Sequence, residues 1–242
     1  IDSDQWETIS PDELNWDSVE IENLYEFLEL NNTRAFVVLK DGKIVIENYW
    51  GNNILNTAPF DRNSSWYWAS AGKTLTALMV GIAQEDGLLS IEDSSAIYLG
   101  NGWTSLTTEQ EGLIKIKHQL TMTTGLDYQV VNLNCTDPDC LSYKNTPGTN
   151  WFYHNATYSL LKDVIENATE TSYNEFTNQK VKIKIGMGGS WIQLNNSDTY
   201  YSTARDMARF GLLILNEGVW DEDVILNDTN YFSNMVNTSQ DI

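Results

Sequence analysis

The spacing of apolar residues predicts a chain that opens with a helix and a β-hairpin. Residues 23–30 (NLYEFLEL) have helical spacing, and residues 34–50 (RAFVVLKDGKIVIENYW) contain two β-rich runs. The two runs are joined by Asp41-Gly42, and an Asp-Gly pair between apolar runs is the strongest short-range hairpin signal. A sheet is therefore expected near the beginning of the chain.

Farther along, the apolar period becomes helical. Apolar residues recur at intervals of three and four in 69–86, and Gly87 stands where a left-handed C-terminal cap is expected. Residues 156–169 and 202–218 have similar stripes, the second opening at a Ser/Thr cap and closing at a glycine. A shorter helix that ends at Gly125 is predicted within 114–128. A hairpin followed by a mostly helical middle indicates the α+β class, a mixed α/β arrangement.

Composition narrows the possible partners. The chain has 242 residues, of which 41% are hydrophobic and nine are Trp, enough for the core of one large domain or two packed lobes. Its net charge of −20 argues against nucleic acid and anionic membrane as partners, because both require clustered Lys and Arg. No apolar run reaches the roughly 20 residues of a membrane span.

Two cysteines, Cys135 and Cys140, flank a turn that contains proline. The favoured interpretation is a small-loop disulfide in an oxidising compartment, and the alternative is a pair of reduced loop thiols. Zinc is disfavoured because the chain has only two His, neither of them nearby. The polar, acidic residues 1–19 resemble the region after a removed signal or lipoprotein anchor, and the start at Ile1 leads us to expect a preceding piece.

The stretch 66–78 (WYWASAGKTLTAL) contains the first candidate for chemistry. A phosphate-binding loop is excluded because Tyr67 stands where its first glycine should be. A Gly-x-Ser-x-Gly nucleophile elbow is also absent around Ser70. A Ser-His-Asp triad is not indicated, because nothing in the spacing singles out either histidine.

What remains is Ser70-x-x-Lys73, a weak pattern because Ser159-x-x-Lys162 also matches it. Ser159 lies inside a predicted helix, whereas Ser70 lies at a helix start, where unpaired N–H groups favour developing negative charge. Lys73 follows one turn later on the same face, and a desolvated lysine can accept a proton. The alternative is that Ser70 only caps the helix.

A second motif, Tyr153-His154-Asn155, follows a Pro-Gly turn and precedes a predicted helix. A tyrosine beside a lysine can share the role of general base. An asparagine amide can hold the lysine and orient a substrate carbonyl or amide at once. The alternative is a loop tyrosine packed on the core, with Asn155 as a helix N-cap.

With these motifs, the chain resembles the serine β-lactamase and penicillin-binding-protein superfamily, on the branch of class C β-lactamases, D-Ala-D-Ala carboxypeptidases and related esterases. Four matching pieces run in the order of that family: residues 70–93, 114–128, 147–166 and 200–220. Together with the hairpin in 36–50, they cover most of the chain. The ordered combination is specific although each short motif is not.

The resemblance implies an antiparallel sheet flanked by helices, plus a mostly helical lobe, within one domain over residues 1–242. Residues 1–68 would supply a helix and the hairpin, 69–200 the helical lobe, and 201–242 a helix and the start of a further sheet region. The family's third motif, Lys-Thr-Gly or a substitute, is not found at the end of the chain. We therefore expect a C-terminal segment supplied by the rest of the protein or by another chain.

The resemblance also assigns roles. It implies Ser70 as the acylated nucleophile, Lys73 as its activating partner, Tyr153 as a second general base or acid, and Asn155 as a contact to Lys73 and substrate. The oxyanion would be bound by the backbone N–H of Ser70 and one N–H from a late strand. No cofactor is implied.

Departures from the family pattern add further candidates. His154 occupies a middle position that is usually small and is expected to line the pocket. Trp68 and Trp151 are also expected to line it, and the alternative is that these tryptophans belong to the core. Met122 replaces a histidine common in the family, at a position expected to be structural.

The predicted function is a serine hydrolase that cleaves a small-molecule or peptide-like ester or amide. An esterase or amidase is favoured; the alternatives are a D-Ala-D-Ala carboxypeptidase, a β-lactamase, or a binding module of this fold without turnover. The expected location is secreted or periplasmic, or anchored as a lipoprotein in a bacterial cell envelope.

Overall fold

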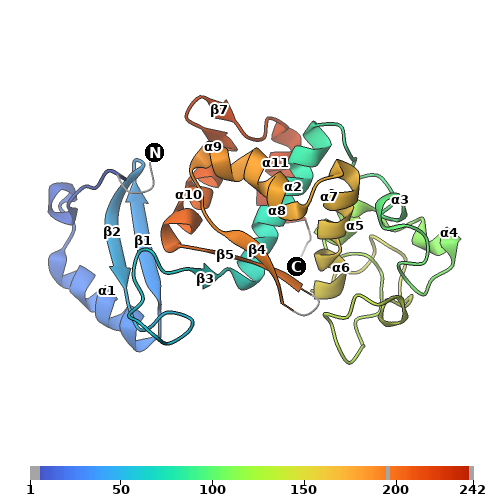
Figure 1. Ribbon diagram of the computed structural model, residues 1–242, viewed down its shortest axis with the longest axis horizontal. Helices are drawn as coiled ribbons and strands as arrows, with labels where there is room; N and C mark the ends of the chain where they lie inside the picture. The colour runs from blue at the N-terminus through green and yellow to red at the C-terminus, as the bar shows by residue number, and fades with distance from the viewer. Residues whose placement is uncertain (1–5, 195–196, 240–242) are drawn as a thin grey trace. The chain divides into compact units, whose positions relative to one another are not determined.

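The computed structural model describes residues 6–194 and 197–239, and the chain divides into two compact units (Figure 1). Each unit is built from segments that are distant in sequence. Unit 1 comprises Ile1–Trp68, Val181–Ser190 and Tyr200–Asp223, and unit 2 comprises Ala69–Lys180, Trp191–Thr199 and Val224–Ile242.

Unit 1 contains the N-terminal helix and hairpin together with the long helix α10. Its elements are η1 (Pro11–Leu14), α1 (Ser18–Leu30), β1 (Ala35–Lys40), β2 (Lys43–Tyr49), β3 (Trp66–Tyr67), α9 (Ile183–Ile185), α10 (Ala204–Leu215) and β6 (Val219–Trp220).

Unit 2 is mostly helical. Its elements are η2 (Ala69–Ala71), α2 (Gly72–Glu85), α3 (Ala96–Leu99), α4 (Thr108–Glu111), α5 (Ile116–Leu120), η3 (Pro138–Cys140), α6 (Asn155–Ser159), α7 (Leu161–Thr169), α8 (Tyr173–Thr177) and α11 (Thr229–Val236). Four short elements contain a point where the chain passes from one unit to the other: η4 (Asn178–Lys182), β4 (Ser190–Leu194), β5 (Ser197–Ser202) and β7 (Asp223–Val224). The strand orders are β1-β2, β3-β5-β4 and β6-β7.

The predicted hairpin is confirmed. β1 and β2 pair antiparallel, with Ala35 opposite Tyr49. At the turn, Asp41 has φ 51° and Gly42 has φ 77°, the positive values that a two-residue turn of this kind requires. The turn is held further by the Trp6 indole N–H, which donates to the Gly42 carbonyl at 2.7 Å.

Helix α10 is anchored in unit 1 by buried charge. The predicted Ser/Thr cap is Thr203, whose side chain accepts from the Asp206 N–H in a capping box. Arg205 donates to both carboxylate oxygens of Glu47 on β2, at 2.6 and 2.7 Å. Arg209 is 1% exposed and lies over the Trp6 ring at 4.6 Å. The helix is therefore tied to the hairpin and to the N-terminal segment.

The core of unit 2 is organised around α2, whose apolar stripe is buried, as its spacing predicts. Helix α2 packs against α7 and α11. A Cβ added at Gly81 would clash with the Tyr231 ring, so glycine permits α11 to approach α2 closely. Gly87, with φ 72°, occupies the predicted left-handed position after the helix.

Two predicted helices are shorter or broken. The helix expected within 114–128 covers only α5, because Met122 turns the chain with φ 55° and Gly125 with φ 76°. The stripe in 156–169 is divided into α6 and α7 at Leu160. In both cases the apolar pattern continues through a backbone turn that periodicity does not report.

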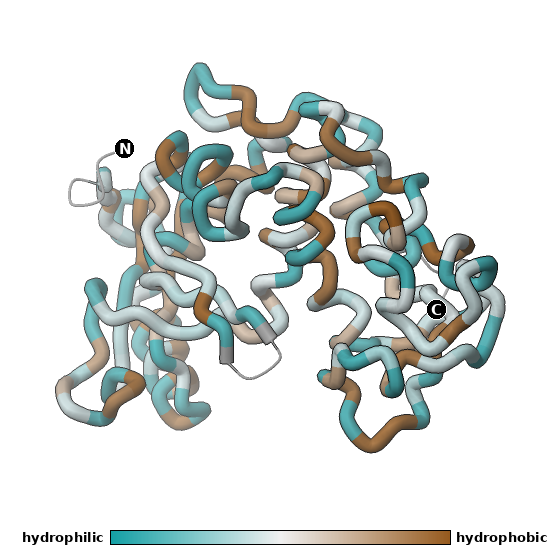
Figure 2. The backbone as a smooth tube through the Cα atoms, turned by 45° about the vertical axis from the view of Figure 1, so that its right-hand side comes forward, coloured by the Kyte–Doolittle hydropathy of each residue, from teal (hydrophilic) through white to brown (hydrophobic). Residues whose placement is uncertain are grey.

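Hydrophobic and hydrophilic residues alternate along the traced chain (Figure 2). Within the described residues, no helix combines the length and the apolar character that crossing a membrane requires. The mixture of helices with antiparallel strands confirms the predicted α+β class.

Candidate active site

Ser70 lies in a short, strained turn at the start of α2. The residue before it, Ala69, has φ 47°, a left-handed conformation that is costly for a residue with a Cβ. Ala69 begins the turn η2, which places Ser70 at the exposed N-terminal end of the helix. Residues held in such conformations cluster at functional sites, and Ser70 follows the strained residue directly.

Lys73 brings the two candidate motifs together within unit 2. Its Nζ lies 3.4 Å from Ser70 Oγ, at the long end of hydrogen bonding. The same atom lies 5.2 Å from the ring centroid of Tyr153 and 5.7 Å from that of Tyr158, within cation–π range. Within the described part of the chain, no carboxylate lies within ion-pair distance of Lys73. The side-chain nitrogen of Lys73 therefore lies next to the serine hydroxyl and two aromatic rings.

The second motif, residues 153–155, is hereafter the tyrosine motif. Tyr153 is 40% exposed, so its ring lies at the surface beside Lys73. Asn155 begins α6, and its Oδ1 is buried with no hydrogen-bond partner among the described residues. A buried acceptor without a partner is costly. The amide oxygen of Asn155 therefore has an unused capacity to accept a hydrogen bond.

Tyr158, which the sequence analysis does not single out, joins α6 to the start of α2. Its hydroxyl donates to the main-chain oxygen of Lys73 at 2.8 Å. Burial, with a smaller effect of Tyr153, raises the pKa of Tyr158 well above its usual range. The phenol therefore stays protonated and serves as a fixed donor between α6 and α2.

His154 does not lie at the surface, where a pocket-lining residue was expected. Its backbone is extended, with φ −110° and ψ 99°, and side chains along extended backbone alternate in direction. Because Tyr153 points outward, His154 points inward and is 3% exposed. Burial lowers the pKa of His154, and the charge of Asp127 opposes this shift only in part. The imidazole is therefore neutral at neutral pH.

The two tryptophans expected to bind substrate have different surroundings. Trp68 is buried in unit 1, where its indole N–H donates to Ser202 Oγ at 2.8 Å and its ring meets Tyr200 edge-on. The structure therefore gives Trp68 a core role. Trp151, in contrast, is 48% exposed on unit 2, two residues before Tyr153.

The second Ser-x-x-Lys match has a different environment. Ser159 Oγ donates to the Asn155 carbonyl at 3.0 Å, within its own helix. Lys162 lies within ion-pair distance of Asp198, Asp163 and Glu166, at 3.7, 3.8 and 3.5 Å. Burial acts to lower the pKa of Lys162, but these carboxylates raise it above its usual value. Lys162 is therefore held as a cation.

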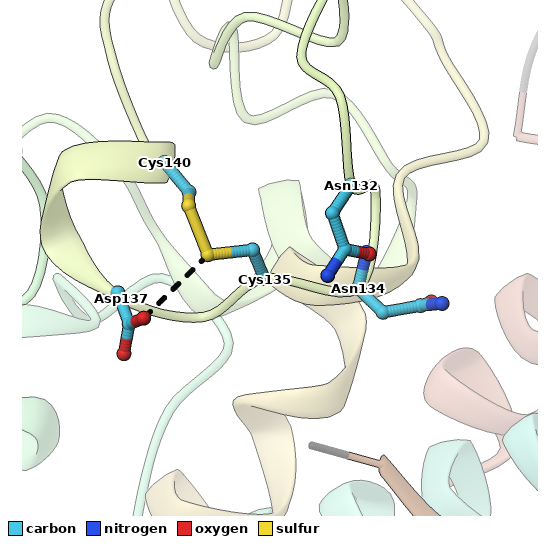
Figure 3. Close-up of a disulfide and its surroundings, with 5 residues drawn as sticks. All are labelled: Asn132, Asn134, Cys135, Asp137 and Cys140. Atoms are coloured by element: carbon cyan, nitrogen blue, oxygen red, sulfur yellow. Dashed lines mark hydrogen bonds between the residues drawn. A yellow bond between two sulfur atoms is a disulfide. The ribbon is translucent and has the colours of Figure 1, made fainter. Parts of the chain in front are cut away.

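The residues expected to form a disulfide are joined in the structure. The Cys135 and Cys140 sulfurs are 2.04 Å apart in unit 2 (Figure 3). Over residues 6–194 and 197–239, no cluster of three His, Cys, Asp or Glu side chains is arranged to hold a metal ion.

The chain matches known proteins in sequence and in fold. A family model for β-lactamases matches residues 33–236, more than half of the chain. The chain belongs to the β-lactamase family. This family falls within a superfamily of serine hydrolases and acyltransferases that includes penicillin-binding proteins.

Two characterised relatives match part of this family member. Penicillin-binding protein 4* of Bacillus subtilis is 29% identical over 184 residues, which cover 69% of this chain and 39% of that protein. The ML-236A carboxylate methylbutanoyltransferase of Penicillium citrinum is 23% identical over 180 residues, covering 62% and 43% respectively. The chain thus spans less than half the length of these relatives.

Solved structures share the fold. A penicillin-binding protein homologue from Pyrococcus abyssi, described as octameric, has a TM-score of 0.69 at 16% identity, over 93% of this chain and 62% of that one. A candidate 6-aminohexanoate-dimer hydrolase from Bacillus anthracis has a TM-score of 0.71 at 21% identity, over 87% and 61%. At these identities the likeness shows the fold, and it agrees with the predicted β-lactamase-like arrangement.

Proposed function

We propose that this β-lactamase family member is a serine hydrolase that cleaves an ester or amide bond through an acyl-enzyme on Ser70. The observation that carries the proposal is the meeting of Ser70 Oγ, Lys73 Nζ and the Tyr153 ring at one exposed site of unit 2. The family match supports acyl chemistry in general. The roles of the individual residues are our inference from this geometry.

In the proposed acylation, Lys73 takes the proton of Ser70 as Oγ attacks the substrate carbonyl carbon. The carbonyl oxygen becomes an oxyanion, which the backbone N–H of Ser70 stabilises at the start of α2. Collapse of the tetrahedral intermediate breaks the ester or amide bond. The leaving alcohol or amine takes the proton from Lys73 through Tyr153. Water then attacks the acyl carbon, its proton returns to Ser70 Oγ, and the carboxylic acid leaves.

Asn155 would stabilise both Lys73 and the substrate through hydrogen bonds of its side-chain amide. Its unpartnered Oδ1 can accept from the Lys73 ammonium, and its amide N–H groups can donate to a substrate carbonyl. We propose this double role because a buried amide oxygen at the first residue of α6 needs a partner.

The run of aromatic residues that ends at Tyr153 favours an esterase or amidase. Trp151 and Tyr153 are 48% and 40% exposed, and Phe152 lies half-buried between them. Such a surface suits an apolar acyl or amide chain. A D-Ala-D-Ala carboxypeptidase, a β-lactamase and a binding module without turnover are the alternatives that the experiment below separates.

We also propose an extracytoplasmic location, secreted or periplasmic. The support is the Cys135–Cys140 disulfide, since disulfides persist mainly in oxidising compartments.

The proposal is tested by covalent labelling. A fluorophosphonate probe should label the protein at one residue, and peptide mass spectrometry should place the adduct on Ser70. Ser70→Ala should abolish labelling, whereas Ser159→Ala, the matched control from the second Ser-x-x-Lys, should retain it. Absence of labelling in a folded wild-type sample would contradict the acyl-enzyme.

The substrate class is then read from turnover. The p-nitrophenyl esters, anilides, a D-Ala-D-Ala peptide and a chromogenic cephalosporin should be compared at equal enzyme concentration. The expected order places esters or anilides first. Faster turnover of the cephalosporin or the peptide would replace the esterase–amidase proposal by the corresponding alternative.

A further inference from the structure

A loop of unit 2, residues 126–145, folds back on itself beside the tyrosine motif. Its base is closed by a β-bridge between Leu126 and Tyr143. Next to this bridge, the Lys144 ammonium lies 4.4 Å from the centroid of the Tyr128 ring. The same ammonium also donates to the side chains on either side of Tyr128 in sequence, at 2.8 Å each. The base of the loop is therefore fixed by several independent contacts.

The tip of the loop is fixed by the disulfide (Figure 3). On one side, the turn at Asn132 is held by bonds from the Cys135 N–H to the Asn132 carbonyl and from the Asn134 N–H to Asn132 Oδ1, at 3.1 and 3.0 Å. On the other side, Cys140 precedes Leu141, which is fully buried in the hydrophobic core of the unit. The disulfide therefore ties an exposed turn to the core.

The turn at residues 132–135 caps α6, the helix that begins at Asn155 of the tyrosine motif. The Leu133 carbonyl accepts from the Ala156 N–H at 2.8 Å. Ala156 is the second residue of α6, and His154 at the N-cap makes no side-chain hydrogen bond to the helix. Because the first N–H groups of a helix lack partners within it, the loop carbonyl supplies one that no capping side chain provides.

A second contact approaches the motif from the other end. The ring of Tyr128 stacks on that of Phe152, with centroids 3.9 Å apart and planes inclined by 13°. Phe152 precedes Tyr153, and its N–H donates to the Met122 carbonyl at 3.1 Å. The tyrosine motif is thus flanked by one loop contact at Phe152 and another at Ala156.

We propose that loop 126–145, with its Cys135–Cys140 disulfide, is a positioning element, which holds the tyrosine motif in the position that proton transfer between Tyr153 and Lys73 needs. The inference rests on the proposed acyl chemistry at Ser70. The loop touches the tyrosine motif through Leu133 and Tyr128, so it acts through that motif and not on the substrate.

The first experiment opens the disulfide. A water-soluble phosphine cleaves the S–S bond to two thiols, and the phosphine takes its oxygen from water as it is oxidised. Reduction should lower kcat for a p-nitrophenyl ester about tenfold while KM changes less than about twofold, because small displacements of catalytic groups act mainly on the transition state. The double variant Cys135→Ser/Cys140→Ser should show the same low kcat and no response to phosphine.

The second experiment leaves the disulfide intact. Tyr128→Ala removes the stacked ring and should lower kcat about fivefold, whereas Tyr128→Phe keeps the ring and should restore wild-type kcat. Val131→Ala is the control within the same loop, because Val131 is fully exposed. It should leave kcat unchanged.

A readout independent of turnover is amide hydrogen exchange over residues 152–159. Phosphine should accelerate exchange there in the wild type and not in the double Cys variant. Unchanged kcat and exchange after thiol titration has confirmed reduction, or wild-type kcat in Tyr128→Ala, would overturn the proposal. Failure of Ser70 labelling in the oxidised protein would instead overturn the proposed function, leaving the exchange result to judge the loop.

Discussion

The two Ser-x-x-Lys sequences of this chain form different structures within the same unit. Ser70 follows a strained residue at a helix start, and Lys73 Nζ points toward its hydroxyl. Ser159 instead donates its hydroxyl proton to a backbone carbonyl one turn earlier, and Lys162 is surrounded by three carboxylates.

The difference lies in what surrounds the lysine. Lys73 contacts a hydroxyl and two aromatic rings, and within the described residues it has no carboxylate at ion-pair distance. A cation paired with carboxylates holds its proton more tightly, so Lys162 is unsuited to act as a base. Both lysines line one cavity of about 40 Å³. The identical sequence pattern therefore serves an electrostatic cluster in one place and a candidate nucleophile in the other.

The largest expected effect separates the two serines. Ser70→Ala should lower kcat/KM for a p-nitrophenyl ester by more than about 1000-fold, because the atom that forms the acyl-enzyme is removed. Ser159→Ala should remain within about threefold of wild type, since the lost hydrogen bond is local and of about 1 kcal/mol. Equal losses in the two variants, measured by steady-state kinetics, would remove the distinction.

Replacing Lys73 should slow acylation far more than replacing Lys162. Lys73→Met should slow acylation at least about 100-fold, as expected when a general base is lost. Lys162→Met should retain acylation within about tenfold and instead lower the free energy of unfolding by about 1–3 kcal/mol, because three partly buried carboxylates lose their counter-ion. Stopped-flow acylation and urea unfolding measure the two effects.

The two tyrosines beside Lys73 sharpen the comparison further. Tyr153→Phe should reduce acylation about 100-fold, because the exposed phenol is the proposed proton donor. Tyr158→Phe removes the bond to the Lys73 carbonyl and should cost about 1 kcal/mol of unfolding free energy, with a smaller kinetic effect. A larger kinetic loss in Tyr158→Phe would assign the proton transfer to that residue instead.

The smallest effect concerns the reverse arrangement, one carboxylate between two lysines. Hydrogen bonds from Lys115 and Lys117 lower the pKa of Glu92 to about 2. Because the folded-state pKa lies below the unfolded value, this stabilisation is present above about pH 4.5 and is lost as the pH falls through about 2.

Glu92→Gln should therefore lower the free energy of unfolding by less than about 1 kcal/mol at pH 7, because the carboxylate is exposed and solvent screens the pair. Urea unfolding at several pH values should show the difference from wild type disappearing toward pH 2. A difference that persists there would show that the two ion pairs are not its source.

Much of the fold could be predicted from local patterns. The Asp41-Gly42 turn, the α2 stripe and the Thr203 cap all depend on residues within a few positions of one another. The predictions were wrong where a helix ends inside a continuous apolar pattern, as before Met122 and at Leu160. Periodicity reports which residues are apolar, and it does not report where a helix is interrupted.

In the candidate site, too, local spacing was predicted correctly and the burial of distant residues was not. Sequence placed Lys73 one turn after Ser70, and the structure brings Nζ to 3.4 Å from Oγ. The sequence also predicted that His154 and Trp68 face a pocket, whereas the structure buries both side chains. Aromatic composition does not distinguish a ring in the core from a ring at a site, because both environments favour large apolar side chains.

The sequence by itself determined the geometry between near neighbours, including the hairpin turn and the spacing of Ser70 and Lys73, because backbone conformation fixes which residues three or four positions apart meet. Only the tertiary structure decided which Ser-x-x-Lys meets a tyrosine, and it added Asp198 to the two carboxylates that already follow Lys162 closely in sequence, Asp163 and Glu166. Tyr153 reaches Lys73 from 80 positions away, and Asp198 reaches Lys162 from 36. Such contacts depend on the packing of whole helices and strands, which no local pattern encodes.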